Sequence, residues 1–463
     1  MNLYRMLARR QEQGRPVGVG LIGAGKFGTM YLSQARLTAG VHIVGIADLD
    51  IARARASCTL AGWPQAQFTA ASLDAAADGT ATFLGDDVAA LVAHPAVEVV
   101  IDATGNPHAG IAHCLQAIDN GKHIVMVNVE ADVVAGPLLA RKAQQAGVVY
   151  SLAWGDQPAL ICEHVDWARA CGFKVVCAGK GTRYLPAYHS LTPDTVWDVL
   201  KQYLEVDESS DINPKMFNSF LDGTKSGIEM TAVCNATGLM AQSGGLTFPP
   251  ASRFELADIC KPAAAGGRLS RDGTTEVVSS LYRDGSEVPN NLVMGTYVVI
   301  EGETDYAREC FRQYHTLPDK SGRYAALYRP THMIGLELGI SVASAACRGE
   351  PTGAPVCFNS DVVATAKRDL AAGEVLDGEG GYMVWGKQTP ASDSLSMNAL
   401  PLGLATDVKL KRHIAAGEHL TWDDVTIDEN NQAVRARREM EAAFAPARDQ
   451  ATIEQGLPAP LTE

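Results

Sequence analysis

The stretch Arg15–Asp50, RPVGVGLIGAGKFGTMYLSQARLTAGVHIVGIADLD, decides the fold of this 463-residue chain. It runs from an apolar segment through a glycine-rich turn and a helical pattern to a second apolar segment that ends at an acidic residue. This order predicts a strand, a tight turn, a helix and a second, parallel strand, which together form the first βαβ unit of an α/β fold.

The glycine turn has the spacing of a dinucleotide-binding loop, Gly23-Ala24-Gly25-Lys26-Phe27-Gly28. Gly23 permits the turn, Gly25 lets the backbone approach a pyrophosphate, and Gly28 lets the following helix pack on the strand. We expect Lys26 and Phe27 to contact the cofactor as well. The alternative is a glycine turn in an unrelated α/β unit, but the flanking strands and the acid favour nucleotide binding.

Asp48 follows Gly28 by about 20 residues, the position at which a carboxylate meets the adenosine ribose. Such a carboxylate favours NAD and repels the 2′-phosphate of NADP. Arg53 and Arg55 follow closely, and they either reach that phosphate or form a solvated helix face. The spacing alone therefore leaves the choice between the two cofactors open.

Composition excludes several classes of partner. The net charge of −14 argues against nucleic acid or an anionic membrane as a bulk partner. No apolar segment is long enough to span a bilayer and no export signal precedes the first strand, so we expect a cytoplasmic protein. The 10 cysteines are scattered without a CxxC spacing, which is typical of reduced thiols rather than a zinc site or a disulfide framework.

The pattern along the chain predicts four segments. Residues 1–155 form a Rossmann-type doubly wound parallel sheet, and residues 156–355 form an α+β substrate domain. Residues 367–376, KRDLAAGEVL, are echoed by residues 411–420, KRHIAAGEHL, which indicates two small units of the same make. This segment, residues 356–428, resembles the small β-rich SAF module, and a helix and tail follow over 429–463.

Two turns of the first domain are expected to face the nicotinamide end of the cofactor. Thr104, Gly105 and Asn106 follow a buried strand, and the carboxyl ends of parallel strands near the reversal of strand order line the ligand crevice. Glu130 follows the next strand. We interpret it as a residue that orients the substrate or a divalent cation, with a surface carboxylate as the alternative.

Candidate groups for the chemistry cluster in the second domain. The chain has no GxSxG, HExxH, P-loop or EF-hand motif, so a chemistry carried by the cofactor is favoured. A lysine that served as acid and base there would need a pKa lowered from about 10.4 by burial. The catalytic candidates are Lys225, Asp222, Lys215 and Glu130, and the substrate-binding candidates are Lys180, Arg183, His189 and Asn218. A solvated helix end is the alternative for each of them.

Four motifs carry a family resemblance. The glycine turn, DATGNPHAG (102–110), GKHIVMVNVEAD (121–132) and GKGTRYLP (179–186) resemble stretches of homoserine dehydrogenases. The chain departs from that family where Val129 occupies the position of a lysine that the family places near cofactor and substrate. The alternative reading is therefore a dehydrogenase of a small hydroxy or sugar acid.

A Rossmann core followed by a SAF module, with NPKMFNSFLDGTKSGIEM (213–230) between them, is similar to the 1-deoxy-D-xylulose 5-phosphate reductoisomerase-like (DRL) family. That resemblance implies an NADP(H)-dependent enzyme, with NAD(H) as the other choice, that converts this phosphorylated sugar to 2-C-methyl-D-erythritol 4-phosphate for isoprenoid synthesis. It also implies a divalent cation such as Mg, Mn or Co, and the candidate ligands are Asp222, Glu130 and Glu229. We further expect a homodimer. A third hypothesis is a sensor that binds nucleotide or sugar without catalysis.

Overall fold

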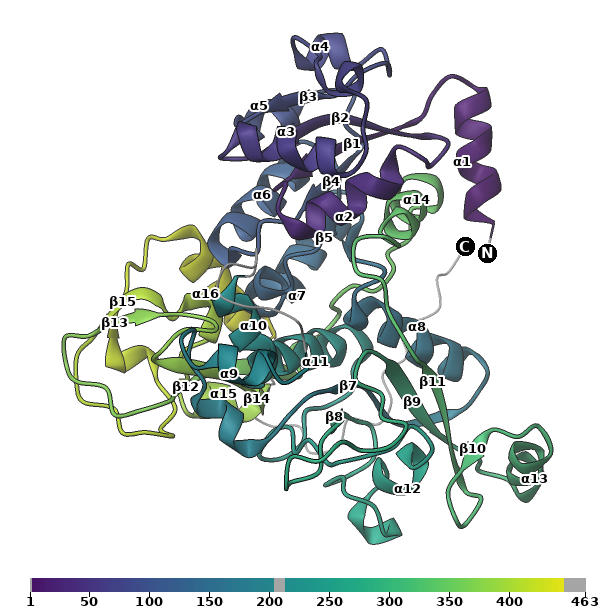
Figure 1. Ribbon diagram of the computed structural model, residues 1–463, viewed down its shortest axis with the longest axis vertical. Coiled ribbons are helices and arrows are strands. Elements are labelled where there is room, and N and C mark those ends of the chain that lie inside the picture. The colour runs from purple at the N-terminus through teal and green to yellow at the C-terminus, as the bar shows by residue number, and fades with distance from the viewer. Residues whose placement is uncertain (1, 204–212, 445–463) are drawn as a thin grey trace.

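The computed structural model describes residues 2–203 and 213–444 (Figure 1). The tail predicted beyond residue 444 lies outside the described residues, and so does the last residue of a helix that the sequence pattern predicts over Pro193–Leu204. Within them the chain forms a parallel sheet, a mixed sheet and two small antiparallel sheets.

The first sheet is doubly wound, as its βαβ pattern predicts. Its six strands are all parallel and lie in the order β3-β2-β1-β4-β5-β6, which confirms the Rossmann-type fold. The strands are β1 (Val17–Ile22), β2 (Val41–Ala47), β3 (Phe83–Gly85), β4 (Val99–Asp102), β5 (His123–Met126) and β6 (Tyr150–Leu152). Strands β1 and β4 are buried along their whole length, because helices cover both faces of the sheet.

Each face of this sheet carries its own apolar core. On one face the sheet packs against helices α1 (Leu3–Glu12), α2 (Lys26–Ala35), α3 (Ile51–Leu60) and α14 (Gly339–Arg348). On the other face it packs against α5 (Val88–Ala93), α6 (Pro107–Asp119) and α7 (Val129–Gln145), and this core continues into the C-terminal part. The short elements η1 (Gln65–Phe68) and α4 (Leu73–Ala76) lie between α3 and β3 in the chain.

The second sheet is mixed, in keeping with the predicted α+β character. Its order is β10-β11-β9-β7-β8, in which only β7 and β8 run parallel. The strands are β7 (Lys174–Thr182), β8 (Thr274–Ser279), β9 (Thr296–Glu301), β10 (Leu317–Pro318) and β11 (Tyr324–Arg329). Its helices are α8 (Gln157–Ala170), η2 (Pro186–Ser190), α9 (Val196–Leu200), α10 (Pro214–Leu221), α11 (Thr224–Thr237), α12 (Leu256–Ile259), η3 (Ala263–Ala265) and α13 (Asp305–Gln313).

The C-terminal part is β-rich, as the sequence predicts. Strands β12 (Ser360–Ala366) and β14 (Val384–Pro390) pair antiparallel, and β13 (Val375–Asp377), β15 (Thr406–Leu410) and β16 (Val425–Thr426) form a second antiparallel sheet. The two repeats build the same local structure: Arg368 pairs with Glu374, and Arg412 pairs with Glu418. The short helices are α15 (Ala391–Ser396), η4 (Leu402–Leu404) and η5 (Trp422–Asp424).

The last described helix packs the C-terminal part against the first domain. Helix α16 (Gln432–Phe444) packs on α6 and α7 of the first domain. Its Arg437 is fully buried and forms an ion pair with the equally buried Asp361 of β12, at 2.6 Å. Paired charges of this kind leave neither group uncompensated in the interior.

Three elements differ from the sequence-based expectation. Helix α7 begins at Val129, because the Asn128 side chain accepts a hydrogen bond from the N–H of Ala131 and caps it, so Glu130 lies in a helix rather than a loop. The Gly, Pro, Ser and Asp content of residues 244–289 predicts loops and turns, but β8 and α12 form within this segment. Helix α14 lies within the segment assigned to the second domain but packs against the first sheet, beside α1 and α2 (Figure 1).

No helix among the described residues is both long and apolar enough to cross a membrane. All the cysteines are free thiols, and six of them are buried.

Candidate active site

The glycine loop between β1 and α2 has the geometry that a pyrophosphate needs. Gly23 has a left-handed φ of +93°, and a Cβ on Gly28 would lie 2.5 Å from the carbonyl oxygen of Gly23. A Cβ on Gly25, by contrast, would meet no atom within 4 Å. Gly25 therefore leaves an open cradle at the N-terminus of the 10-residue helix α2, where free N–H groups attract a phosphate.

Asp48 holds the glycine loop in place. Its carboxylate accepts hydrogen bonds from the N–H groups of Ala24, at 2.7 Å, and Asp50, at 2.8 Å. It also forms an ion pair with Arg53 at 2.5 Å, and its side chain is only 1% exposed. Burial raises the pKa of Asp48, but these three partners outweigh burial and hold the pKa below its ordinary value.

The loop after β4 is held by a buried polar network. Asp102, at the end of β4, accepts hydrogen bonds from the hydroxyl of Thr104, at 2.9 Å, and from Nδ1 of His113, at 2.6 Å. The amide of Asn128, after β5, donates to Asp102 at 3.2 Å and to the carbonyl of Asn106 at 2.8 Å. The network joins the two turns that the sequence places at the crevice.

Glu130 lies in the first turn of α7, two residues beyond Asn128, and forms an ion pair with Lys225. Lys225 belongs to the first turn of α11, in the second domain. Its side chain is 16% exposed and that of Glu130 is 11% exposed. The pair therefore spans the junction between the two domains at the carboxyl edge of the first sheet.

Several carboxylates surround the Lys225 ammonium. Burial alone lowers the pKa of Lys225, but the nearby charges of Glu130, Glu379, Glu229 and Asp156 together raise the pKa above its ordinary value. Lys225 therefore lacks the lowered pKa that a lysine acting as acid and base would need. Lys225 is an ammonium at neutral pH.

Two of these carboxyl groups are held partly protonated. Burial raises the pKa of Glu379 to about 7, and repulsion from Glu130 adds to that effect. Burial raises the pKa of Asp156 to about 6, with repulsion from Glu229 as the next cause. Sequence reasoning missed both groups: Asp156 reads as the cap of α8, and Glu379 lies in a turn far along the chain. No local motif marks either of them.

Two further buried ion pairs lie on the same elements. Lys180 of β7 pairs with Glu229 of α11, and Lys367 pairs with Asp222 at 2.8 Å. Lys367 also donates hydrogen bonds to the carbonyl groups of Leu191, at 2.7 Å, and Gly381, at 2.8 Å.

The remaining candidates do not converge on one cavity. Arg183 pairs with Glu287 at 3.0 Å, and Lys215 donates to the carbonyl of Asp377 at 3.2 Å. Asn218 is fully buried and donates to carbonyl groups, that of Gly380 at 2.8 Å among them. The structure thus brings Glu130, Lys225 and Glu229 together and leaves Arg183 and Lys215 with other partners.

The expected divalent cation finds no support. Glu130, Glu229 and Asp222, the carboxylates offered as its ligands, pair with three different lysines. In residues 2–203 and 213–444, no group of three or more His, Cys, Asp or Glu side chains is arranged to hold a metal ion.

Two family models match the chain. The NAD-binding domain of homoserine dehydrogenase matches residues 18–152, and the catalytic domain of oxidoreductase DRL matches residues 155–338. The chain therefore carries NAD(P)-dependent oxidoreductase domains, and the resemblance of its first domain to homoserine dehydrogenases is confirmed. No curated protein matches the chain in sequence.

The match to the DRL catalytic domain corrects the activity that the sequence analysis predicts. The matched catalytic domain describes an oxidoreductase, and DRL in this sense is not a deoxyxylulose-phosphate reductoisomerase. The expectation of a reductoisomerase for isoprenoid synthesis is therefore wrong, and the alternative, a homoserine dehydrogenase-like enzyme, fits the matched domains better.

Solved structures give distant likenesses. Dihydrodipicolinate reductase from Paenisporosarcina sp. TG-14 is 12% identical, with 73% of this chain and 97% of that chain covered and a TM-score of 0.34. Myo-inositol dehydrogenase from Lactobacillus casei is 17% identical over 39% of this chain, with a TM-score of 0.28, and the match spans half of that enzyme. The one from Corynebacterium glutamicum is 11% identical over 39% of this chain and 48% of that chain, with a TM-score of 0.27. TM-scores this low do not support a comparison of function between these proteins and this chain.

Proposed function

We propose that the protein is an NAD(P)-dependent dehydrogenase that interconverts a hydroxyl and a carbonyl group on a small polar substrate. The observation that carries the proposal is the ion pair between Lys225 and Glu130 beside the cofactor-binding turns. It adds to the match with the two oxidoreductase domain models. Reduction of a carbonyl needs a hydride and a proton, and the chain must supply the proton.

Lys225 is the cation that we propose binds the reacting oxygen. When bound, the nicotinamide supplies or accepts the hydride. In the direction of reduction, Lys225 Nζ donates a hydrogen bond to the carbonyl oxygen and stabilises the negative charge that develops there. Protonated Glu379 then gives the proton that makes the hydroxyl group of the product. In the direction of oxidation the Lys225 ammonium stabilises the alkoxide that develops on that oxygen, since nearby opposite charge favours the anion. Glu130 holds Nζ in place through both directions.

Glu379 is the proposed acceptor for the proton that leaves the alcohol. With a pKa of about 7 it exchanges protons readily near neutral pH. Ser219 donates a hydrogen bond to its carboxyl group, which orients it. Both its position beside Lys225 and its titration range suit a proton relay.

The carboxyl groups around Lys225 affect which class of substrate can bind there. Glu130, Glu379, Glu229 and Asp156 all act on this one ammonium. A phosphate ester placed there would meet repulsion from the carboxylates, whereas hydroxyl groups donate hydrogen bonds to them. We therefore favour a neutral polyhydroxylated or amino-alcohol substrate over a sugar phosphate.

NADP(H) is the cofactor that we favour. The Asp48 carboxylate faces the glycine loop, is 1% exposed and is paired with Arg53, so its repulsion of a 2′-phosphate is reduced. The Arg53 side chain is 54% exposed and offers further N–H donors on its guanidinium group. These two features support the NADP(H) preference.

A substrate screen tests the proposed function. Purified protein is incubated with NADP+ or NAD+ and a panel of polyols, sugar acids, hydroxy acids and homoserine, and nicotinamide absorbance is followed. We expect turnover of at least one unphosphorylated alcohol, and loss of that turnover in Lys225→Met. Failure of both cofactors to bind, or turnover confined to phosphorylated sugars, would contradict the proposal.

A further inference from the structure

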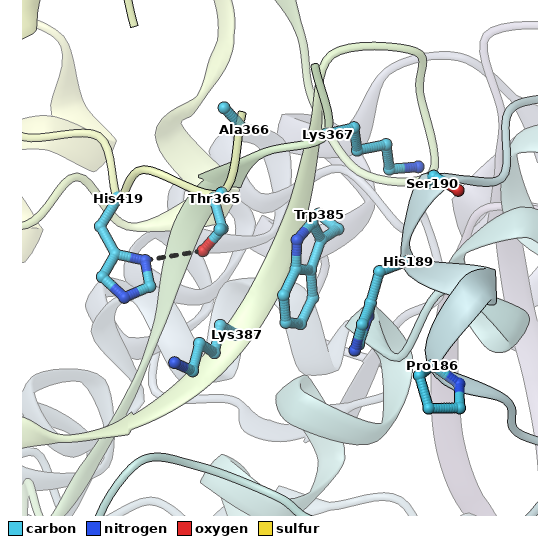
Figure 2. Close-up of a pocket in the computed structure, with 10 residues that line it drawn as sticks. Pro186, His189, Ser190, Thr365, Ala366, Lys367, Trp385, Lys387 and His419 are labelled. Atoms are coloured by element: carbon cyan, nitrogen blue, oxygen red, sulfur yellow. Dashed lines mark hydrogen bonds between the residues drawn. The ribbon is translucent and has the colours of Figure 1, made fainter. Parts of the chain in front are cut away.

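A separate cavity of about 340 Å³ lies between the C-terminal part and η2 of the second domain (Figure 2). Its walls come from η2, from β12 and β14, and from the second repeat near residue 419. The lining residues are Pro186, His189, Ser190, Thr365, Ala366, Lys367, Trp385, Lys387, Gly417 and His419. Neither Lys225 nor any of the carboxylates around it lines this cavity.

The strand register gathers polar side chains on one wall. Thr365 of β12 is paired with Trp385 of β14 on one side and bridged to His419 on the other. Lys387 is two residues beyond Trp385, so both side chains project from the same face of β14. Figure 2 shows Lys387 and His419 on one side of Trp385 and His189 on the other.

His189 closes the cavity without offering a donor to it. Its ring stacks on Trp385 with a centroid distance of 3.8 Å. Nδ1 donates to the carbonyl of Asp222 at 2.6 Å, so Nε2 accepts from the Tyr184 hydroxyl at 2.8 Å. Both nitrogens are therefore used, and His189 acts as a rigid aromatic wall.

The free donors belong to three other residues. Lys387 has no ion-pair or hydrogen-bond partner within the part of the chain that the structure describes, and the same holds for the indole N–H of Trp385. Nδ1 of His419 and the Thr365 hydroxyl lie 2.9 Å apart, and when that hydroxyl donates to Nδ1 the ring proton is on Nε2, which can donate to a ligand. Lys367, although it lines the cavity, has its charge paired with Asp222 and donates hydrogen bonds to two carbonyl groups.

The cavity is also free of negative side chains. None of its lining residues is Asp or Glu, although the chain carries 53 of these residues and a net charge of −14. A lysine ammonium, an imidazole N–H and an indole N–H thus face a space without a competing carboxylate. Such a set of donors matches the oxygens of an anion, and an ammonium binds phosphoryl oxygens as a point charge.

We propose that this cavity is a binding site for a small phosphoryl oxyanion, either free or as a phosphate ester. Lys387 supplies the charge, His419 Nε2 and Trp385 Nε1 supply directional hydrogen bonds, and the stacked His189 and Trp385 rings form the apolar wall for an ester's carbon atoms. The site is distinct from the proposed hydride-transfer site, so a phosphorylated compound binds here as an effector rather than as the redox substrate.

Calorimetric titration of the full chain tests this site. Inorganic phosphate and glycerol 3-phosphate are titrated separately into the protein at fixed ionic strength set with chloride. We expect saturable binding of both, with tighter binding of the ester if the aromatic wall contributes, and equal binding if only the oxyanion is recognised. Lys387→Gln should weaken the binding of both by about tenfold or more, because it removes the only charged donor that is free in the described part of the cavity.

Two further variants separate binding from folding. His419→Gln removes a different donor and should also weaken binding, whereas Lys409→Gln, an exposed lysine on β15, is the matched control and should bind as the wild type does. Circular dichroism checks that each variant is folded. Absence of saturable binding to the folded wild type, or unchanged binding in both Lys387→Gln and His419→Gln, would overturn the proposal.

Discussion

Lys225 and Glu130 form an ion pair that joins the first turn of α11 to the first turn of α7. Asn128 caps that same turn of α7 and bonds to Asp102 and Asn106, so one short segment links the cofactor crevice to the second domain. The pair thus couples the position of a cation to the turns that hold the cofactor.

Lys225→Met should lower kcat by roughly 10²- to 10³-fold with the substrate found by screening, because it removes the ammonium proposed to stabilise the negative charge on the reacting oxygen. Binding of NADPH, followed by fluorescence, should stay near the wild-type value, since Lys225 lies outside the glycine loop. Lys215→Met, an exposed lysine on α10, is the control and should leave kcat within about twofold. A kcat unchanged in Lys225→Met would remove this residue from the mechanism.

Arg53→Gln should weaken NADPH binding by about tenfold and leave NADH binding unchanged, because it removes the guanidinium beside Asp48. Arg55→Gln is the matched control, since Arg55 lies over the Phe68 ring and not against Asp48. Equilibrium titration of each variant with both cofactors makes the comparison. Equal weakening for NADH and NADPH would mean that Arg53 does not recognise the 2′-phosphate.

Gly25→Ala should lower cofactor affinity, whereas Gly28→Ala should lower thermal stability. The Cβ on Gly25 enters open space, so this variant should keep its thermal stability but lose cofactor affinity where the pyrophosphate lies. The Cβ on Gly28 would meet the Gly23 carbonyl at 2.5 Å, so this variant should melt at a lower temperature. Thermal unfolding with and without NADPH measures both effects. A Gly25→Ala protein with normal cofactor affinity would contradict the proposed position of the pyrophosphate.

Asp132→Asn should make the protein less sensitive to rising pH. Burial raises the pKa of Asp132 to about 7, although the Tyr150 hydroxyl donates to it at 2.7 Å and opposes the rise. Since the pKa of Asp132 in the folded protein lies above the ordinary value of 3.8, its contribution to stability is complete below that value and is lost as pH rises through about 7. At pH 8, chosen to lie about one unit above that pKa, the asparagine variant should be more stable than the wild type by on the order of 1–3 kcal/mol.

Urea unfolding of the Asp132→Asn protein at acidic and alkaline pH measures this effect. Asp407→Asn, at an exposed position with a left-handed φ that asparagine tolerates, is the control and should follow the wild type. If wild type and Asp132→Asn lose stability in parallel as pH rises, Asp132 is not the group that titrates.

Local sequence patterns are sufficient to predict the first two strands of the first domain. Strands Val17–Ile22 and Val41–Ala47 have the bounds that their apolar runs predict, because a strand buried on both faces is continuously apolar. The position of Glu130 could not be read in the same way, since the cap at Asn128 and the long helix after it are not apparent from a short apolar pattern.

The site itself depends on contacts between distant segments. Lys225 was recognised as a candidate from its segment, but its neighbours Asp156 and Glu379 come from residues far away in the sequence. Their pKa values are set by burial and by charged groups from other segments, and neither influence is visible in a linear sequence. The same reason explains why Lys225 has a raised rather than a lowered pKa.

The return of α14 to the first sheet bears on how the chain folds during synthesis. Leu338, Val342 and Ala343 fill the core beneath α1 and α2, so the nucleotide-binding half stays incomplete until residues beyond 340 have left the ribosome. Fragments that stop near residue 155 would expose that apolar surface to solvent. We therefore expect such truncations to aggregate rather than to yield an isolated, soluble coenzyme-binding unit.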